Sequence, residues 1–388
     1  MPAKFTFSAG TDLPEIREEV ADELGFITRH VSPLLIELGF PNDLKVVRNV
    51  KHEWGEDALL GNSAVIDGAF SAVATALSVD SPQGLNLRLG DEVQIEGSLE
   101  LMVVVAPAPT ATVVNVTRGI KGTTAVAIAD NAILKRVGNP AIEDESAPSA
   151  RSTNRSRIAN FTQIFRDVAS VTRSMMKADL LFGVEEELEH QIMRIQQDLT
   201  RDLARTVISG KAQTVNPEGT TTQARTMNGI IHSILGGSDP STRDAVGGPI
   251  TESLLNLLLQ DMWSKGGEPD LLVAGPAQRR KLSALLPSRQ RFQPGETTLG
   301  AVVETFISDF GPIDVLAPEE FMPPNLIMLL DRAKVRMVKL GEEGDPYEVL
   351  PLAQEGLTFR REVVGEFGLE ILNAGDGGHG LIQNLSTT

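Results

Sequence analysis

The sequence predicts an α+β fold organised around one long helix, and three observations lead to this prediction. Over residues 184–209 apolar residues recur at spacings of three or four, the period of an amphipathic helix. Residues 51–140 instead carry short runs of β-forming residues separated by glycine and aspartate. After residue 223 helical and strand patterns alternate, and the chain ends in β-type sequence.

Composition narrows the class of protein. With 388 residues the chain can bury at least one large core, and its length suggests two or three structural units. Only 4% of residues are aromatic, so aliphatic residues must supply most of the packing. The net charge of -17 argues against tight nucleic-acid binding, which needs a basic surface. The absence of cysteine excludes disulfides and thiolate metal sites.

Residues 1–50 are expected to form an arm that is partly helical and partly extended. A helix begins at Thr11 or Asp12 and is broken near Gly25 and again at Pro33. The segment lacks the basic start and apolar run of a secretory signal, and nowhere do about 18 apolar residues follow one another. We therefore expect a protein made in a cytoplasm, with no membrane partner.

Residues 51–157 are expected to form a β-rich module of five or six strands. Residues 119–122 have the composition of a hairpin turn, and residues 143–157 that of a polar linker. The best strands are predicted at residues 92–95, 99–105, 111–117 and 125–128.

Residues 158–215 contain the longest predicted element, the helix at residues 184–209, which Gly210 is expected to end. Glutamates near its start and arginines near its end suit the helix dipole. A single apolar stripe should face the core as the spine of the subunit. It consists of Val184, Leu188, Ile192, Ile195, Leu199, Leu203 and Val207.

The remaining chain is predicted as a polar loop to residue 223, a compact α/β domain that ends with a strand at residues 335–340, and a β-type tail at residues 349–385. The domain should contain helices at residues 251–264 and 277–286, strands at 270–274 and 326–330, and a β pair around 310–313. The tail should contain strands at residues 357–361 and 366–372.

Several strings imitate catalytic motifs but lack the context that the chemistry needs. Gly375, Gly377 and Gly380 have the spacing of a dinucleotide loop, yet too few residues follow for a helix and a second strand. Ser174 and Lys177 have the Ser-x-x-Lys spacing of serine acylases without the companion motifs. The histidines show no metal-ligand spacing. We expect no catalytic residue, cofactor or metal, and hence no enzyme.

Short strings accompany these elements in a definite order. They are His52-Glu53-Trp54 with Asp57 and Leu59, Arg118-Gly119 and Gly122-Thr123, Asn160-Phe161-Thr162-Gln163-Ile164-Phe165, Ile208-Ser209-Gly210, Met227-Asn228-Gly229-Ile230, and Glu366-Phe367-Gly368-Leu369-Glu370 followed by His379-Gly380. Over nearly the whole chain, this arrangement resembles the tailed-bacteriophage major capsid proteins of the Johnson fold, also called the Hong Kong phage fold.

The resemblance implies an N-terminal arm (residues 1–50), a β-rich extended loop (51–157), a peripheral domain around the spine helix (158–215), an axial domain (216–334) and C-terminal strands that return to the peripheral domain (335–388). Such subunits form hexamers and pentamers that close an icosahedral viral head around double-stranded DNA. A β module on a polar tether is a poor independent domain, so it would lie across a neighbour that covers its edge strands.

Arginines are the candidate contacts between subunits, because they could pair with acidic patches on neighbouring copies. A solvated basic face is the alternative. The candidates are Arg118, Arg151, Arg155, Arg157, Arg279 and Arg280.

The expected partners are copies of the chain itself, a portal protein, a separate scaffolding protein, decoration proteins, and packaged DNA in loose, non-specific contact. Because no long scaffolding segment precedes the arm, scaffolding is expected to come from a separate protein or from a segment already cleaved. The expected location is the virion, with assembly in the host cytoplasm. Two alternatives stay open, namely an encapsulin-like cellular compartment and, from another class, a Ser-x-x-Lys hydrolase.

Overall fold

The computed structural model describes residues 32–57, 61–141, 143, 155–177, 186–285, 290–291, 304–354 and 356–387. The chain forms two compact units. The body contains residues up to Trp54 and from Arg157 onward, and the second unit runs from Gly55 to Ser156. The chain leaves the body through β2 (Lys51–Glu56) and returns through β9 (Ser156–Phe161), which pair in a two-stranded sheet.

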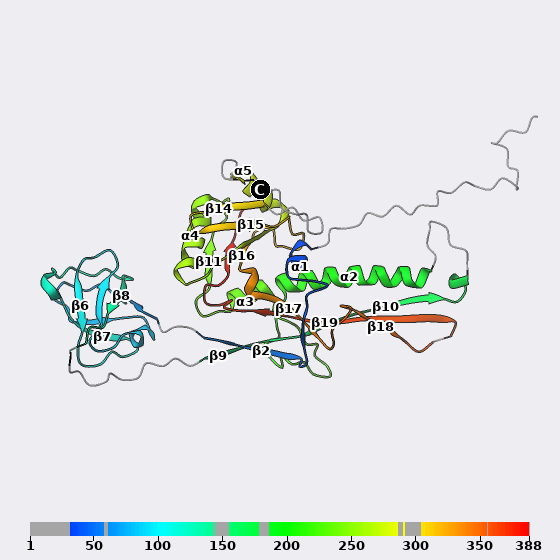
Figure 1. The fold of residues 1–388 in the computed structure, drawn as a ribbon, viewed down its shortest axis with the longest axis horizontal. Coiled ribbons are helices and arrows are strands. Elements are labelled where there is room, and N and C mark those ends of the chain that lie inside the picture. Colours follow the sequence, from blue (N-terminus) through cyan, green and yellow to red (C-terminus); the bar gives the residue numbers. More distant parts are fainter. Residues whose placement is uncertain are drawn as a thin grey trace, which may run out of the picture. The chain divides into compact units, whose positions relative to one another are not determined.

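The body contains a five-stranded sheet, along which α2 (Glu187–Ser209) lies (Figure 1). The strand order is β1-β17-β19-β10, and β18 also pairs with β19. The strands are β1 (Lys45–Val47), β17 (Val335–Leu340), β19 (Thr358–Ile371), β10 (Gln163–Thr172) and β18 (Glu348–Pro351).

β19 is a single strand of 14 residues, where the sequence predicted two shorter strands. Glycines interrupt its hydrophobic pattern, but they mark close packing and not a break in the strand. A Cβ atom on Gly365 would lie 2.5 Å from the Phe367 ring and 2.7 Å from the Tyr347 ring.

The predicted apolar stripe of α2 is buried in the second half of the helix. Leu199, Leu203 and Val207 belong to the largest core cluster, together with Ala204 and Ile208, which the stripe omitted. In the first half Leu188 is buried, whereas Ile192 and Ile195 are only partly buried. The first half packs on β10 and β19, whereas the second half is also covered by α3 (Ile230–Leu235). Val184 lies outside the described residues.

Gly210 ends α2 as predicted, but not through a left-handed C′ conformation. Its φ is -59° and its ψ is 149°, which is extended backbone. Glycine is needed because a Cβ atom would lie 2.4 Å from the carbonyl oxygen of Thr206.

The body also contains a mixed seven-stranded sheet of order β11-β20-β16-β12-β15-β14-β13. One face carries α4 (Glu252–Ser264) and α5 (Pro276–Leu285), and the other joins the core of α2 and α3. The strands are β11 (Ser241–Asp244), β20 (Gly380–Gln383), β16 (Ile327–Leu330), β12 (Leu271–Ala274), β15 (Gly311–Val315), β14 (Glu304–Ser308) and β13 (Gln290–Arg291).

The C-terminal strands do not all lie in one sheet. The sequence analysis had expected all of them to return to the peripheral domain. β17, β18 and β19 pair in the five-stranded sheet, but β20 pairs with β11 and β16 of the seven-stranded sheet. The tail therefore returns to both sheets.

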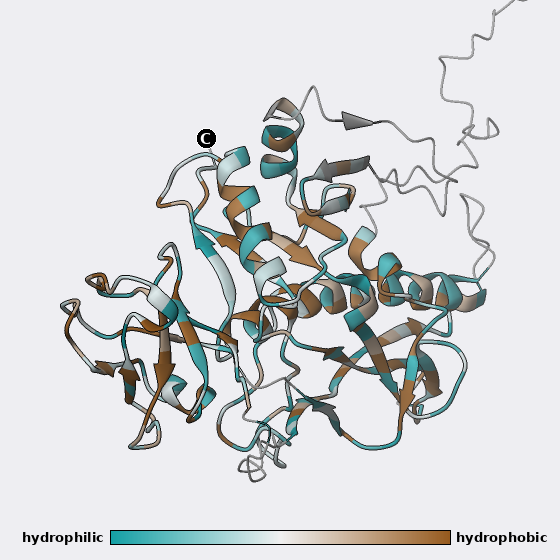
Figure 2. Ribbon diagram, turned by 60° about the vertical axis from the view of Figure 1, so that its left-hand side comes forward, coloured by the Kyte–Doolittle hydropathy of each residue, from teal (hydrophilic) through white to brown (hydrophobic). Residues whose placement is uncertain are grey.

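The second unit is a closed antiparallel β-barrel, and we call it the barrel. Its strand order is β3-β8-β5-β6-β7-β4, and a bridge between Ile66 and Val79 joins the first strand to the last. Hydrophobic residues recur along its strands (Figure 2), and they enclose a separate core that includes Leu77, Met102 and Leu134. The strands are β3 (Ser63–Val65), β4 (Ala76–Ser78), β5 (Glu92–Ile95), β6 (Leu101–Val104), β7 (Val113–Thr117) and β8 (Ile133–Gly138).

This closure corrects the expectation of a module whose edge strands need a neighbour, because each strand finds its second partner within the barrel. The predicted strand at residues 125–128 is absent, since only Ile128 pairs, with Phe70. The predicted hairpin turn is a short 3-10 turn over Ile120–Gly122.

The described part of the arm holds α1 (Pro33–Glu37), and here the sequence prediction was wrong. Pro33 begins this helix and does not break one, because proline is tolerated in the first turn, where its missing N–H has no partner. Ser32 caps the helix by accepting a hydrogen bond from the Leu35 N–H at 3.3 Å. The helix predicted from Thr11 lies outside the described residues.

Candidate functional site: the root and the clasp

Several strings that carried the resemblance meet within the body, beside β2 and β9. Asn160 is 4% exposed, and its side chain joins three of them. Its Nδ2 donates to the carbonyl oxygens of Leu369 at 2.8 Å and Asn228 at 3.0 Å, and its Oδ1 accepts from the Asn228 N–H at 2.9 Å. We call this cluster the root. It consists of Asn160, Thr162, Arg225, Asn228, Glu366 and Glu370 with their partners Lys45 and His52.

Glu366 forms the second link of the root. It accepts hydrogen bonds from the Thr162 hydroxyl at 2.5 Å and from the Arg225 guanidinium. Arg225 Nε also donates to the Thr162 carbonyl, and the Thr162 N–H donates to the carbonyl of Val50, which directly precedes β2. The link therefore ties the beginning of β2 to Thr162, the one residue between β9 and β10.

Glu370 forms the third link. One oxygen, Oε2, lies 2.6 Å from Lys45 Nζ and 2.5 Å from His52 Nε2. Burial by itself would raise the pKa of Glu370, but the hydrogen bonds from Lys45 and His52 outweigh burial and lower it. The carboxylate is thus held charged beside two basic groups, and no nucleophile adjoins it among its described contacts.

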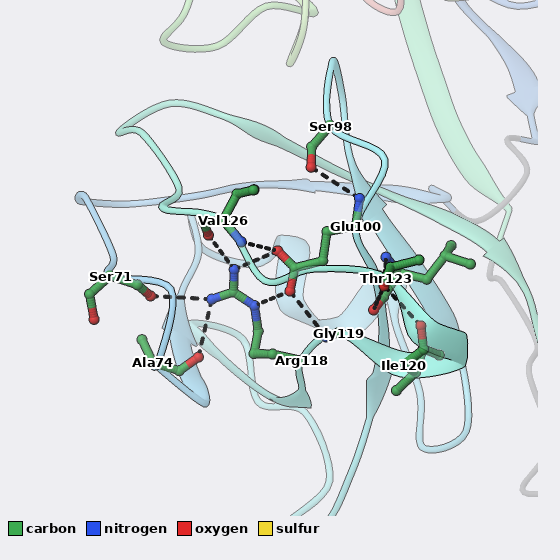
Figure 3. Close-up of polar contacts among 10 residues, drawn as sticks. Ser71, Ala74, Ser98, Glu100, Arg118, Gly119, Ile120, Thr123 and Val126 are labelled. Carbon is green, nitrogen blue, oxygen red and sulfur yellow. Dashed lines mark hydrogen bonds and ion pairs between the residues drawn. The ribbon is translucent and has the colours of Figure 1, made fainter.

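The barrel has its own polar centre, which we call the clasp, made by Glu100 and Arg118 (Figure 3). Arg118 Nε donates to Glu100 Oε1 at 2.6 Å and Nη2 to Oε2 at 2.7 Å. The remaining guanidinium hydrogens reach the carbonyls of Ser71, Ala74 and Val126. All five N–H donors of the side chain are therefore used inside the barrel.

The carboxylate of Glu100 also has hydrogen-bond donors besides Arg118. It accepts further hydrogen bonds from the N–H groups of Val126 at 2.9 Å and Gly119 at 3.2 Å. Burial alone would raise the pKa of Glu100, but Arg118 and the backbone donors hold it below its ordinary value. The clasp joins three loops of the barrel by one buried ion pair.

The clasp removes Arg118 from the candidate contacts between subunits. Its side chain is 6% exposed and that of Glu100 is fully buried. A guanidinium with all its donors used inside one unit has none to offer a neighbour.

The other candidate arginines differ in what surrounds them. Arg155 and Arg157 are exposed, and they pair loosely with Asp57 at 3.6 Å and Glu53 at 3.3 Å. On α5, Arg280 is exposed and Arg279 is partly buried. Their role between subunits stays a prediction, and Arg151 lies outside the described residues.

The strings that imitate catalytic motifs lie in local structures that differ from those of the motifs. Ser174 and Lys177 are exposed at a 3-10 turn, where the Lys177 N–H donates to the Ser174 carbonyl. Gly380 begins β20, with no helix after it. In the described part of the chain there is no group of three or more His, Asp or Glu residues that could hold a metal. No described helix is long and apolar enough to cross a membrane.

Two buried titratable groups, His379 and Glu319, are structural. The sequence analysis named His379 only as part of a string, and it did not name Glu319. His379 accepts a hydrogen bond from the Asp331 N–H at 3.3 Å, and burial lowers its pKa to about 4. Glu319 accepts from the Ser32 hydroxyl at 2.6 Å and the Leu34 N–H at 3.2 Å, and burial raises its pKa. Glu319 thereby fixes the start of α1 from a position 287 residues away in the sequence.

Comparison with known proteins gives a family match and a likeness of fold. The model of the family described as the SU10 major capsid protein matches residues 2–386. The capsid of a native GTA particle shares 9% identity with a TM-score of 0.52, over 96% of each chain. This likeness shows the fold alone. No curated protein matches the sequence.

Two further solved structures are less similar in three dimensions. A chain from Mycobacterium phage Adephagia has a TM-score of 0.49 at 11% identity, over 97% of this chain and 96% of that chain. An encapsulin complex from Synechococcus elongatus has a TM-score of 0.42 at 15% identity, over 61% of this chain and 77% of that chain.

Proposed function

This chain belongs to the SU10 major capsid protein family, and we propose that it builds a phage head by associating with copies of itself into hexamers and pentamers of an icosahedral shell. The observation that carries the proposal is the family match over residues 2–386. The capsid-type fold of the chain agrees with it. The protein is thus a structural component of the virion.

The body supplies the rigid part of the proposed subunit. Its two sheets share the core cluster around α2, α3 and β19, so they are packed as one piece. We assign the five-stranded sheet and α2 to the peripheral domain and the seven-stranded sheet to the axial domain. The barrel occupies the position of the extended loop, and the root fixes the strands through which it is attached.

The charge of the chain fits a container for DNA. With a net charge of -17, an acidic inner wall would repel packaged DNA and keep its contacts loose and non-specific. A portal protein, a separate scaffolding protein and decoration proteins complete the proposed set of partners. Synthesis and assembly are proposed to take place in the host cytoplasm.

Size-exclusion chromatography and negative-stain electron microscopy of the full chain expressed alone test the proposal. Closed shells or rings of five and six subunits are expected. A clean small oligomer that still fails to assemble with a co-expressed scaffold would contradict self-assembly. Shells that enclose protein and no DNA in infected or expressing cells would instead favour an encapsulin-like compartment.

A further inference from the structure

Two large aromatic side chains of the body are exposed to solvent and lie against each other. Trp263, the penultimate residue of α4, is 61% exposed, and Phe310, in the turn between β14 and β15, is 40% exposed. Their ring centroids are 6.1 Å apart. The chain has only two tryptophans, and tryptophan is enriched among the residues that dominate protein–protein binding. The exposed pair therefore marks a candidate binding surface.

The backbone beneath both rings is fixed. In the turn, the Ser308 hydroxyl donates to the Gly311 carbonyl at 2.7 Å and accepts from the Phe310 N–H at 3.2 Å. At the end of α4, the Gly267 N–H donates to the Met262 carbonyl at 2.8 Å. Side chains on a preorganised backbone lose little conformational entropy when they bind a partner.

Two carboxylates border the aromatic pair. Glu268 lies just before β12, and Asp309 lies just before β15. β12 and β15 are parallel neighbours, with Leu271 opposite Asp314, so the residues that precede the two strands lie at the same end of the sheet. Glu268 and Asp309 are exposed, and neither forms an ion pair with any residue that the structure describes.

The basic residues near the end of α4 pair with other carboxylates. Lys265 Nζ lies 2.9 Å from Asp239 and 3.3 Å from Asp261, and Arg243 also approaches Asp261, at 3.6 Å. The aromatic pair thus keeps an acidic border, and both the ring faces and the carboxylates attract cations. We call this set the aromatic surface. It consists of Trp263, Glu268, Asp309 and Phe310.

We propose that the aromatic surface is the docking site for a cationic segment of a separate protein. Lysine or arginine side chains of that segment would lie over the rings and pair with Glu268 and Asp309, while their aliphatic stems and neighbouring apolar residues cover Trp263 and Phe310. An apolar centre with a polar rim is the usual composition of an interface between proteins.

Charge favours a separate protein over a second copy as the occupant. The chain has 52 acidic and 35 basic residues, so a second copy would bring mostly like charge to a surface whose own unpaired groups are both negative. The proposal adds a partner-binding surface to the subunit and does not depend on how the copies associate.

A fluorescein-labelled helical peptide of Leu, Ala and Lys is the probe, and fluorescence anisotropy measures its binding to the full chain. Glu268→Gln with Asp309→Asn should weaken binding about tenfold, and Phe310→Ser should do so by a similar factor. Glu342→Gln with Glu343→Gln is the matched control. It removes the same charge from two exposed residues after β17 and should leave the affinity unchanged. The same peptide with Glu in place of Lys should not bind.

Tryptophan emission locates the bound probe. An unlabelled sample of the Lys peptide should change the emission of the Trp54→Phe chain, in which Trp263 is the only tryptophan, and should leave the emission of Trp263→Phe unchanged. Leu257→Ser controls for the loss of exposed apolar surface, because Leu257 is 47% exposed on the same helix, and it should not alter the affinity.

The outcomes separate this proposal from the proposed function. Equal affinity of all variants, or equal binding of the Glu peptide, would overturn the docking site, because the attraction would then be to the acidic surface in general. Smaller assemblies from Phe310→Ser than from wild type would also overturn it, since a second copy would then cover the rings. The peptide is titrated against the subunit in any state of assembly, so failure of the wild-type chain to assemble contradicts the proposed function alone.

Discussion

The barrel and the body bury their apolar residues by different routes. In the barrel, the strands come from one continuous stretch of the chain and pair around a closed ring, and one ion pair fixes the loops at its end. In the body, β1 near the beginning of the chain pairs with β17, and Asn160 binds Leu369, 209 residues away. The comparison teaches that the barrel core is complete within residues 61–141, whereas the body core joins residues from both sides of the barrel segment, from Leu34 to Leu381.

The largest expected effect sharpens this contrast. Leu199 in α2 is 6% exposed, so Leu199→Asp would bury an unpaired carboxylate. We expect a loss of more than about 4 kcal/mol in the free energy of unfolding of the body, and hence no soluble shells. Met193→Asp is the control, because Met193 is 50% exposed on the same helix. Limited proteolysis should still release a resistant barrel fragment. Digestion of that fragment together with the body would break the comparison.

The second prediction concerns the barrel alone. Arg118→Ala leaves Glu100 as an uncompensated buried charge, and breaking a buried pair in this way costs about 3–5 kcal/mol. Calorimetry should show a lowered barrel transition and an unchanged body transition. Lys135→Ala breaks an exposed pair with Glu96 and should change stability by about 1 kcal/mol or less. A shift of both transitions by Arg118→Ala would mean that the two units are coupled.

The third prediction uses pH to test the root. The folded pKa of Glu370 lies below its ordinary value of 4.5, so its stabilisation is complete above that pH and is lost as the pH falls through the lowered pKa. Glu370→Gln should cost about 1.5–3 kcal/mol at neutral pH, the value of hydrogen bonds to a charged group. In the variant, the protection of β2 and β19 against hydrogen exchange should then fall less as the pH is lowered. An unchanged pH profile in the variant would show that Glu370 does not control the root.

The smallest effect is expected at the exposed arginines. Replacing Arg151, Arg155 and Arg157 with alanine should alter the stability of the isolated subunit by about 1 kcal/mol or less, because exposed ion pairs are weak. If these residues bridge subunits, the salt concentration that dissociates assembled shells should fall. Light scattering over a salt gradient measures this. Unchanged salt tolerance would leave them as a solvated face.

Much of the secondary structure could be predicted because its signals are local. α4 begins after Thr251, whose side chain accepts from the Leu254 N–H, and that capping pattern is readable from the sequence. β17 spans the predicted residues for the same reason, since its alternation is carried by neighbouring residues. The prediction of two strands in place of β19 was wrong. Gly365 favours a strand break locally, but glycine is needed there because a Cβ atom would collide with the Tyr347 and Phe367 rings.

The candidate site was predicted only in part. The strings at Asn160, Glu366 and Glu370 were singled out by resemblance, yet nothing in the sequence showed that they bind one another or Arg225. Arg118 was singled out for the wrong role. Its partner Glu100 is 18 residues away, and only the closure of the barrel makes the pair internal.

The sequence by itself determined the α+β class, the long amphipathic helix, the extent of the β-rich segment and the absence of recognisable catalytic motifs, because periodicity, caps and motif spacing are properties of residues near one another in the chain. Tertiary structure alone decided that the β-rich segment closes into a barrel and that β20 pairs in a different sheet from the other C-terminal strands. It also decided that the hydrogen bonds of Arg118 are made inside the barrel. These features depend on contacts between residues distant in sequence, whose pairing is fixed by the path of the whole chain.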